Sequence, residues 1–138
     1  MQRRRASAAI VVVLGASALG ACGVADDRAA SRATVERFAD AQRRGDGAAA
    51  CALLGDEAVR TLVEQEGGPC RRAVRSVELG GRRITRVKVY ITSAKVDLAG
   101  GASAFLDREP EGWRLSAVGC RPSEGKPADR PLDCELDG

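Results

Sequence analysis

Cysteine is the residue type of this 138-residue chain whose chemistry is easiest to predict, and it occurs five times. Cys51, Cys70, Cys120 and Cys134 lie far apart along the chain, and none belongs to a Cys-x-x-Cys pair. The chain has no histidine. Because structural zinc sites use closely spaced cysteines or histidines, this pattern argues against a metal and favours disulfide bonds. We therefore predict neither a metal nor a cofactor.

The fifth cysteine, Cys22, ends a segment that is typical of exported proteins. Arginines at positions 3–5 are followed by an uncharged run of small and aliphatic residues at 8–19. With roughly a dozen residues, this run is shorter than the ~20 that span a bilayer, which favours a signal peptide over a transmembrane helix. Residues 19–22, Leu-Gly-Ala-Cys, resemble the bacterial lipobox. The resemblance implies removal of residues 1–21 and attachment of diacylglycerol to the Cys22 thiol; the alternative is a plain signal peptide.

Lipidation of Cys22 would leave an even number of thiols in a chain sent to an oxidising compartment. Sequence alone does not select among the pairings that the other cysteines allow. We prefer Cys51 with Cys70 and Cys120 with Cys134, because each pair closes a local loop. In the chain-entropy model, such loops of roughly 15 to 20 residues stabilise a fold by about 3 kcal/mol each.

Helical spacing of apolar residues dominates the first half of the mature chain. Residues 22–30 are small and polar, and we interpret them as a tether between the lipid and the domain. Val35, Phe38, Ala39 and Gln42 then recur at helical spacing in a helix predicted to start at an N-cap, Ser31, and to stop at Gly45. Further short helices are predicted over residues 46–54, 56–66 and 70–77.

After two glycines at 80–81, the hydrophobic period changes from about 3.6 to two. Strands are predicted near residues 87–91, 95–99, 102–108 and 113–120, as an antiparallel meander with a Gly-Gly hairpin turn. Val87, Val89 and Ile91 are expected to face the core, with Tyr90 on the opposite face. The domain is assigned to residues 31–120. Residues 121–138 form a proline-containing tail that Cys134 ties to it.

Helices followed by a meander predict an α+β fold, with three to four N-terminal helices on a curved antiparallel sheet. With the turn at residues 111–113, Glu-Gly-Trp, this order resembles the cone-shaped nuclear transport factor 2-like superfamily. The chain as a whole is similar to small actinobacterial lipoproteins of unassigned activity. The features that it shares with them are a lipobox, a short tether, such a domain, and a late Gly-Cys followed by a proline-containing tail with another cysteine. The alternative is a cystatin-like sheet with one long helix.

The resemblance implies a candidate pocket at the open end of the cone. Phe38, Tyr90, Phe105 and Trp113 are the large aromatic residues available to line it, although packing into the core is the interpretation that we favour. Asp40 and Tyr90 are conceivable as the base and the oxyanion donor of an isomerase-type reaction. Because Asp40 is expected on the solvated face of its helix, we predict no catalytic residue.

The net charge of the mature chain gives no reason to expect nucleic acid as a partner. The chain has 22 basic and 19 acidic residues, and the arginines at 3–5 leave with the signal peptide, so the mature chain is balanced. Arginines also cluster at residues 71–75 and 82–86. We interpret these clusters as a solvated face that Glu64, Glu66 and Glu78 compensate, rather than as a contact for anionic lipid headgroups.

Together these features predict a lipoprotein on the extracytoplasmic face of the cell membrane, acting as a non-catalytic binding or interaction module. Its expected partners are the membrane, through the lipid anchor, and either an apolar small ligand or an envelope protein. A ligand requires an internal cavity, whereas a protein partner requires an exposed apolar patch. The alternatives are an isomerase or dehydratase, and an accessory subunit of an envelope transporter or sensor.

Overall fold

The computed structural model describes residues 22–123 and 132–138, so the predicted signal peptide lies outside the described residues. The fold is α+β, as predicted. The helical half comprises α1 (Cys22–Arg43), α2 (Gly47–Cys51), α3 (Asp56–Glu66), α4 (Cys70–Ala73) and the 3-10 turn η1 (Val74–Ser76). The strands that follow are β1 (Ile84–Val89), β2 (Ser93–Leu98), β3 (Ser103–Glu109), β4 (Gly112–Pro122), β5 (Leu132–Asp133) and β6 (Leu136–Asp137).

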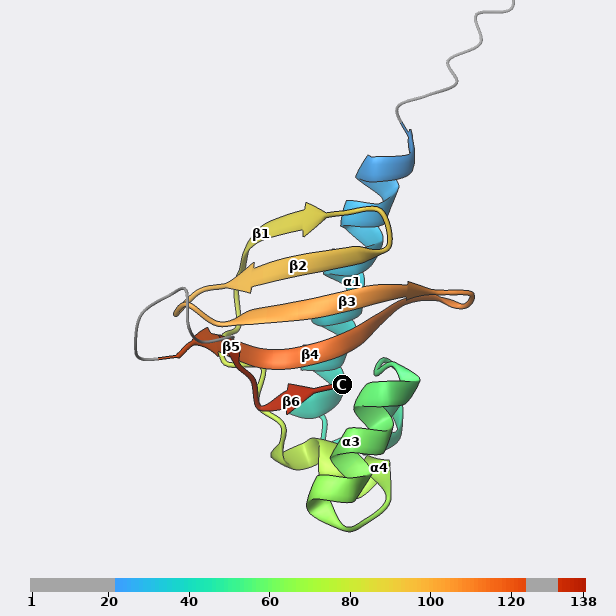
Figure 1. The fold of residues 1–138 in the computed structure, drawn as a ribbon, viewed down its shortest axis with the longest axis vertical. Coiled ribbons are helices and arrows are strands. Elements are labelled where there is room, and N and C mark those ends of the chain that lie inside the picture. Colours follow the sequence, from blue (N-terminus) through green and yellow to red (C-terminus); the bar gives the residue numbers. More distant parts are fainter. Residues whose placement is uncertain (1–21, 124–131) are drawn as a thin grey trace, which may run out of the picture.

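The predicted meander is confirmed. Within the described ranges, the strands form one antiparallel sheet in the order β1-β2-β3-β4-β5, with β6 also paired to β4 (Figure 1). The register shifts between Ile84 and Arg86 on β1 and on either side of Phe105 on β3. Such irregularities bend a strand and increase its twist, which agrees with the curvature of the sheet.

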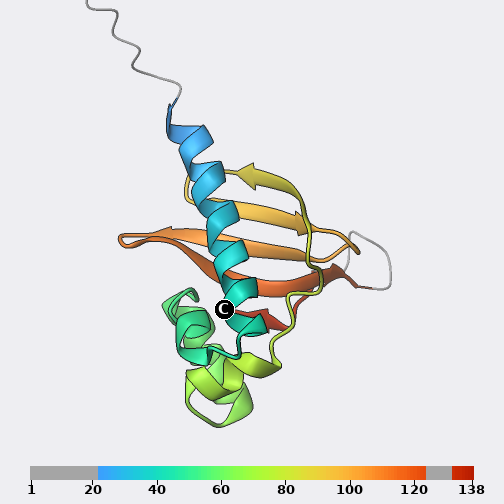
Figure 2. The ribbon, with the colours of Figure 1, turned by 180° about the vertical axis from the view of Figure 1, so that it is seen from behind.

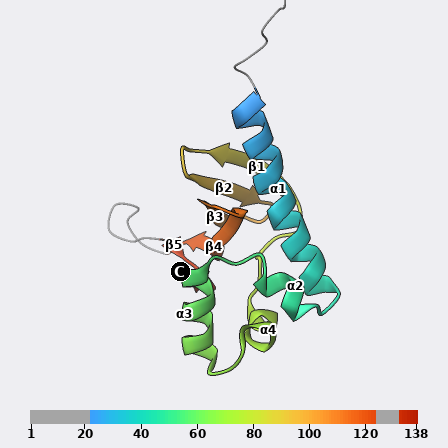
Figure 3. The ribbon, with the colours of Figure 1, turned by 90° about the vertical axis from the view of Figure 1, so that its right-hand side faces the viewer.

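The long helix α1 crosses one face of the sheet, and α2, α3 and α4 lie beyond its β4 edge (Figures 2 and 3). Phe38 of α1 is fully buried against the inner face, where Val96, Leu106 and Leu115 are also fully buried. Burial alternates along β2, because Ala94, Val96 and Leu98 point to α1, whereas Lys95 and Asp97 do not. One long helix on a curved antiparallel sheet is compatible with both the cone-shaped and the helix-on-sheet expectations.

The helix α1 begins earlier than its sequence indicates. Residues 22–30, interpreted above as a tether, belong to its first turns, which project beyond β1 (Figure 1). These turns are attached to the sheet, because one carboxylate oxygen of Asp27 pairs with Arg108 and the other accepts a hydrogen bond from Nε1 of Trp113 at 3.4 Å. Ser31 is therefore a buried residue inside the helix and not its N-cap.

The end of β1 also differs from the prediction. The strand stops at Val89, and Tyr90 and Ile91 lie in the connection to β2. The amide of Tyr90 donates to the carbonyl of Ser93 at 2.8 Å, which closes this connection. Ile91, expected to face the core, is instead 92% exposed, because the chain reverses before the alternation reaches it.

Candidate functional site

The four aromatic residues predicted to line a pocket are not brought together. Phe38 and Trp113 are buried in the core, Phe105 is half-buried on the outer face of the sheet, and Tyr90 is 56% exposed beside Ile91. The Nζ atom of Lys95 lies 5.9 Å from the centre of the Phe105 ring, and the guanidinium carbon of Arg108 lies 4.8 Å from that of Trp113. Packing into the core, which we favoured, therefore holds for Phe38 and Trp113, whereas Phe105 makes a cation-π contact on the outer face and Tyr90 is exposed.

Two adjoining surface hollows lie at the C-terminal end of α1, away from the aromatic residues that were predicted to line a pocket. One, of about 540 Å³, lies between the last turn of α1, the segment from η1 to β1, and β4. A second, of about 320 Å³, lies between α4 and the turn from α1 to α2. Arg75 lines both, and we treat the two adjoining hollows together as one open trough. The arginines in its lining are Arg43, Arg71, Arg72, Arg75, Arg82 and Arg121, and we call it the arginine trough.

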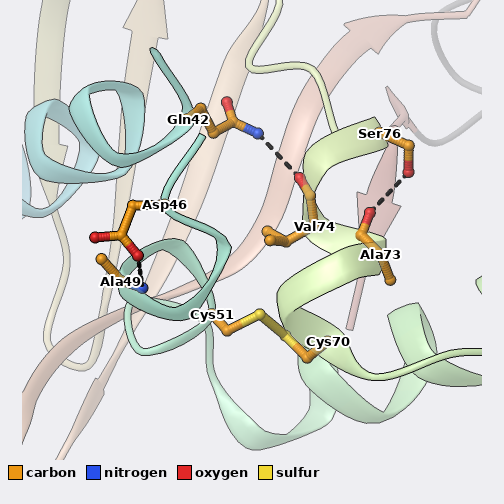
Figure 4. The surroundings of a disulfide bond; sticks show 8 residues. All are labelled: Gln42, Asp46, Ala49, Cys51, Cys70, Ala73, Val74 and Ser76. Carbon is orange, nitrogen blue, oxygen red and sulfur yellow. Dashed lines mark hydrogen bonds between the residues drawn. A yellow bond between two sulfur atoms is a disulfide. The ribbon is translucent and has the colours of Figure 1, made fainter. Parts of the chain in front are cut away.

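A disulfide and a half-buried amide hold one wall of the arginine trough in place (Figure 4). Cys51 of α2 is bonded to Cys70, the first residue of α4, which confirms the preferred pairing. The Gln42 side chain of α1 donates from Nε2 to the carbonyls of Val74, at 3.2 Å, and of Val77. Arg71, Arg72 and Arg75 lie within the segment, residues 70–77, that these contacts fix.

Helices α2 and α4 also pack backbone against backbone. A Cβ atom on Gly47 would lie 1.8 Å from the carbonyl oxygen of Arg71, so a larger residue at this position would force the two helices apart. Asp46 caps α2 by accepting a hydrogen bond from the amide of Ala49 at 3.0 Å. The glycine therefore allows the close approach of α2 and α4 beside the arginine trough, and the cap fixes the start of α2.

Arg121 forms part of the opposite wall, near the second disulfide. Its guanidinium donates to the carbonyls of Gly100, at 2.7 Å, and of Gly80, at 2.8 Å. Cys120, the preceding residue, is bonded to Cys134, so the second preferred pairing is also confirmed. These contacts join β4, the turn after β2 and the segment before β1, while Arg121 keeps a positive charge without a carboxylate partner among the described residues.

The electrostatic balance of the arginine trough is strongly positive. Asp46 and Glu78 are the acidic residues of its lining, and Arg43 is paired with Asp40 of its own helix. In the part of the chain that the structure describes, the side chains of Arg71, Arg72, Arg75 and Arg82 have no ion-pair or hydrogen-bond partner. As predicted for a solvated face, these arginines are exposed, but none of them forms an ion pair with Glu64, Glu66 or Glu78 in the described structure.

The acid-base pair considered from the sequence is not assembled either. Asp40 is held by Arg43, and Tyr90 lies in the connection between β1 and β2. Among the described residues, no group of His, Cys, Asp or Glu side chains could hold a metal ion, and no helix is both long and apolar enough to cross a membrane.

Asp97 is the residue whose ionisation the fold clearly changes. Burial by itself would raise its pKa, but Nζ of Lys95 at 3.1 Å, the hydroxyl of Ser103 at 2.9 Å and the charge of Arg86 together lower the pKa below its ordinary value. These contacts lie on the outer face of the sheet and keep the carboxylate charged, which is the opposite of what a general acid needs.

The fold and its site thus define an α+β domain with two disulfides and an arginine-lined trough. Comparison of the chain with protein-family models, with curated proteins and with solved structures finds no match in any of the three. The function is accordingly inferred from the residues of the chain itself.

Proposed function

We propose that this chain is a lipid-anchored binding module on the extracytoplasmic face of the cell membrane, without catalytic activity of its own. The observation that carries the proposal is the course of α1. This helix of 22 residues begins at Cys22, the predicted lipidation site, and ends at Arg43 on the rim of the arginine trough. At about 1.5 Å per residue it spans roughly 33 Å, so it displays the trough at a distance from the lipid-bearing end.

Three features support binding rather than catalysis. The candidate base Asp40 is engaged by Arg43, all four cysteines of the domain are oxidised, and the carboxylate of Asp97 is held in its charged form. Oxidised cysteines offer no thiolate nucleophile. A surface for an envelope partner is also favoured over capture of an apolar ligand, because the inner face of the sheet is filled by Phe38 and its neighbours.

A Cys22→Ala variant tests the anchor in the native host. We expect loss of lipid labelling and either retention of the uncleaved signal peptide or release of the protein from the membrane. Cys22→Ala is compared with Cys51→Ala, which removes a cysteine that the proposal assigns to a disulfide. Normal lipid labelling of Cys51→Ala is expected. A processed Cys22→Ala protein that stays in the membrane fraction would overturn the anchor.

A further inference from the structure

We propose that the arginine trough binds a linear acidic polymer of the cell envelope, charged through phosphate or carboxylate groups. The inference rests on the proposed function for the location of the domain and adds the chemical class of its ligand. It begins from charge segregation: the mature chain is balanced overall, yet Arg71, Arg72, Arg75 and Arg82 have no acidic partner among the described residues. A guanidinium offers paired N–H donors that match the geometry of phosphate and carboxylate oxygens.

The openness of the trough favours many linked charges over one small anion. Arg71, Arg72, Arg75 and Arg82 are all exposed to solvent. A single exposed ion pair is worth little, because water and salt screen it. Several weak contacts become effective when the anions belong to one molecule, since each later contact is then intramolecular. Arg75 lines both hollows, so a linear ligand that contacts Arg75 has arginines of either hollow within its reach.

The surroundings of the trough favour a polymer over a folded protein partner. Protein interfaces have an apolar centre. The large exposed hydrophobic residues of the described chain are Val24, Tyr90 and Ile91, and none of them lines either hollow. A linear acidic polymer needs no such apolar centre, because its charges and hydroxyl groups contact the protein along its length.

Distance along α1 favours a ligand outside the membrane over lipid headgroups. Val24 lies near the start of α1, whereas Gln42 and Arg43, which line the trough, lie in its last turn. The helix places these ends roughly 30 Å apart, which is several Debye lengths at physiological salt. The trough therefore lies well away from the end of the chain that the proposed lipid would hold at the bilayer.

Binding is tested with the intact protein, extracted from its own membranes or secreted, in a neutral detergent, using end-tethered linear polyphosphate and polygalacturonate as probes. We expect both or one of them to bind at low ionic strength, with affinity falling steeply as salt is added. The polymer that binds more tightly assigns the charged group of the ligand. Replacing Arg75→Gln together with Arg82→Gln should weaken binding about tenfold and lower the slope of log affinity against log salt by about two.

The matched control combines Arg28→Gln with Arg86→Gln, which removes the same charge from exposed residues outside the trough. This control should change affinity by less than about twofold. Equal loss in both double variants would overturn the site, and so would failure of both polymers to bind. Displacement by orthophosphate at equal total phosphate would contradict a polymer ligand. Tighter binding to phosphatidylglycerol than to phosphatidylcholine vesicles, lost in the Arg75→Gln, Arg82→Gln variant, would assign the trough to a membrane. All these results are independent of whether Cys22 carries lipid.

Discussion

The side-chain amide of Gln42 donates a hydrogen bond to the carbonyl of Val74, at 3.2 Å and across 32 residues of sequence. The same nitrogen also reaches the carbonyl of Val77. Through this one side chain, the end of α1 sets the position of η1 and the start of the segment that leads to β1 (Figure 4). The placement of Arg75, which lies between the two carbonyls in sequence, therefore depends on a residue of α1.

Replacing Gln42→Ala should lower the free energy of unfolding by about 1 kcal/mol, because two partly buried carbonyls lose their donor. Chemical denaturation followed by circular dichroism measures this loss. Gln65→Ala is the control, since Gln65 is exposed near the end of α3, and its replacement should change stability by less than about 0.5 kcal/mol. Equal stabilities of the two variants would show that the Gln42 contacts contribute nothing.

Removal of the disulfide between α2 and α4 is expected to destabilise the domain by about 3 kcal/mol in a Cys51→Ala, Cys70→Ala double variant. The bond closes a loop with a sequence separation of 19, so its loss frees the unfolded chain. The single variant Cys51→Ala should expose one new thiol, at Cys70, in peptide mapping after labelling. Labelling at Cys120 or Cys134 instead would contradict the pairing.

The disulfide pairing and the strand order were predictable because both follow from local sequence. Loop length favoured the two pairs, alternating residues marked strands, and the glycine pair at residues 100–101 marked one hairpin. The start of α1 was not predictable, because its first turns are stabilised by the contacts of Asp27 with Arg108 and Trp113, which are distant in sequence. The exposure of Ile91 depends on where β1 ends. Apolar and polar residues continue to alternate past that point, so the sequence pattern does not indicate the end of the strand.

Core and surface apolar residues should respond very differently to truncation. Phe38→Ala is expected to cost about 4 kcal/mol, because Phe38 is fully buried between α1 and the sheet and its removal leaves a cavity. Ile91→Ser should change stability by less than about 0.5 kcal/mol, since Ile91 is 92% exposed. Urea titrations of both variants measure their free energies of unfolding. A large loss of stability in Ile91→Ser would place that residue in the core.

The lowered pKa of Asp97 predicts that the stability of the domain falls at acidic pH. Because the folded state lowers the pKa of Asp97, its contribution is present above the unfolded pKa and is lost as pH falls through the folded value. Asp97→Asn should therefore reduce stability at neutral pH and flatten the decline below about pH 4. Unfolding free energies measured from neutral to acidic pH, with Asp107→Asn as an exposed control, test this sign. An Asp97→Asn curve parallel to the wild type would contradict it.

The candidate site was predicted less well than the fold. Arginine clusters at residues 71–75 and 82–86 are visible in the sequence, but whether glutamates pair with them depends on side-chain placement, which sequence spacing does not determine. The role of Gln42 could have been predicted from the sequence, because it is a polar residue on the apolar stripe of α1, where a hydrogen bond is expected. The role of Arg121 could not have been predicted, because the carbonyls of Gly80 and Gly100 that it contacts belong to turns distant in sequence.

The intact mass of the mature protein, extracted from its own membranes, shows whether it is a lipid-anchored module. We expect a chain that begins at Cys22 and carries acyl chains, in which Cys51, Cys70, Cys120 and Cys134 react with an alkylating reagent only after reduction. A chain without acyl chains, or one that is cut elsewhere, would contradict a lipid-anchored module.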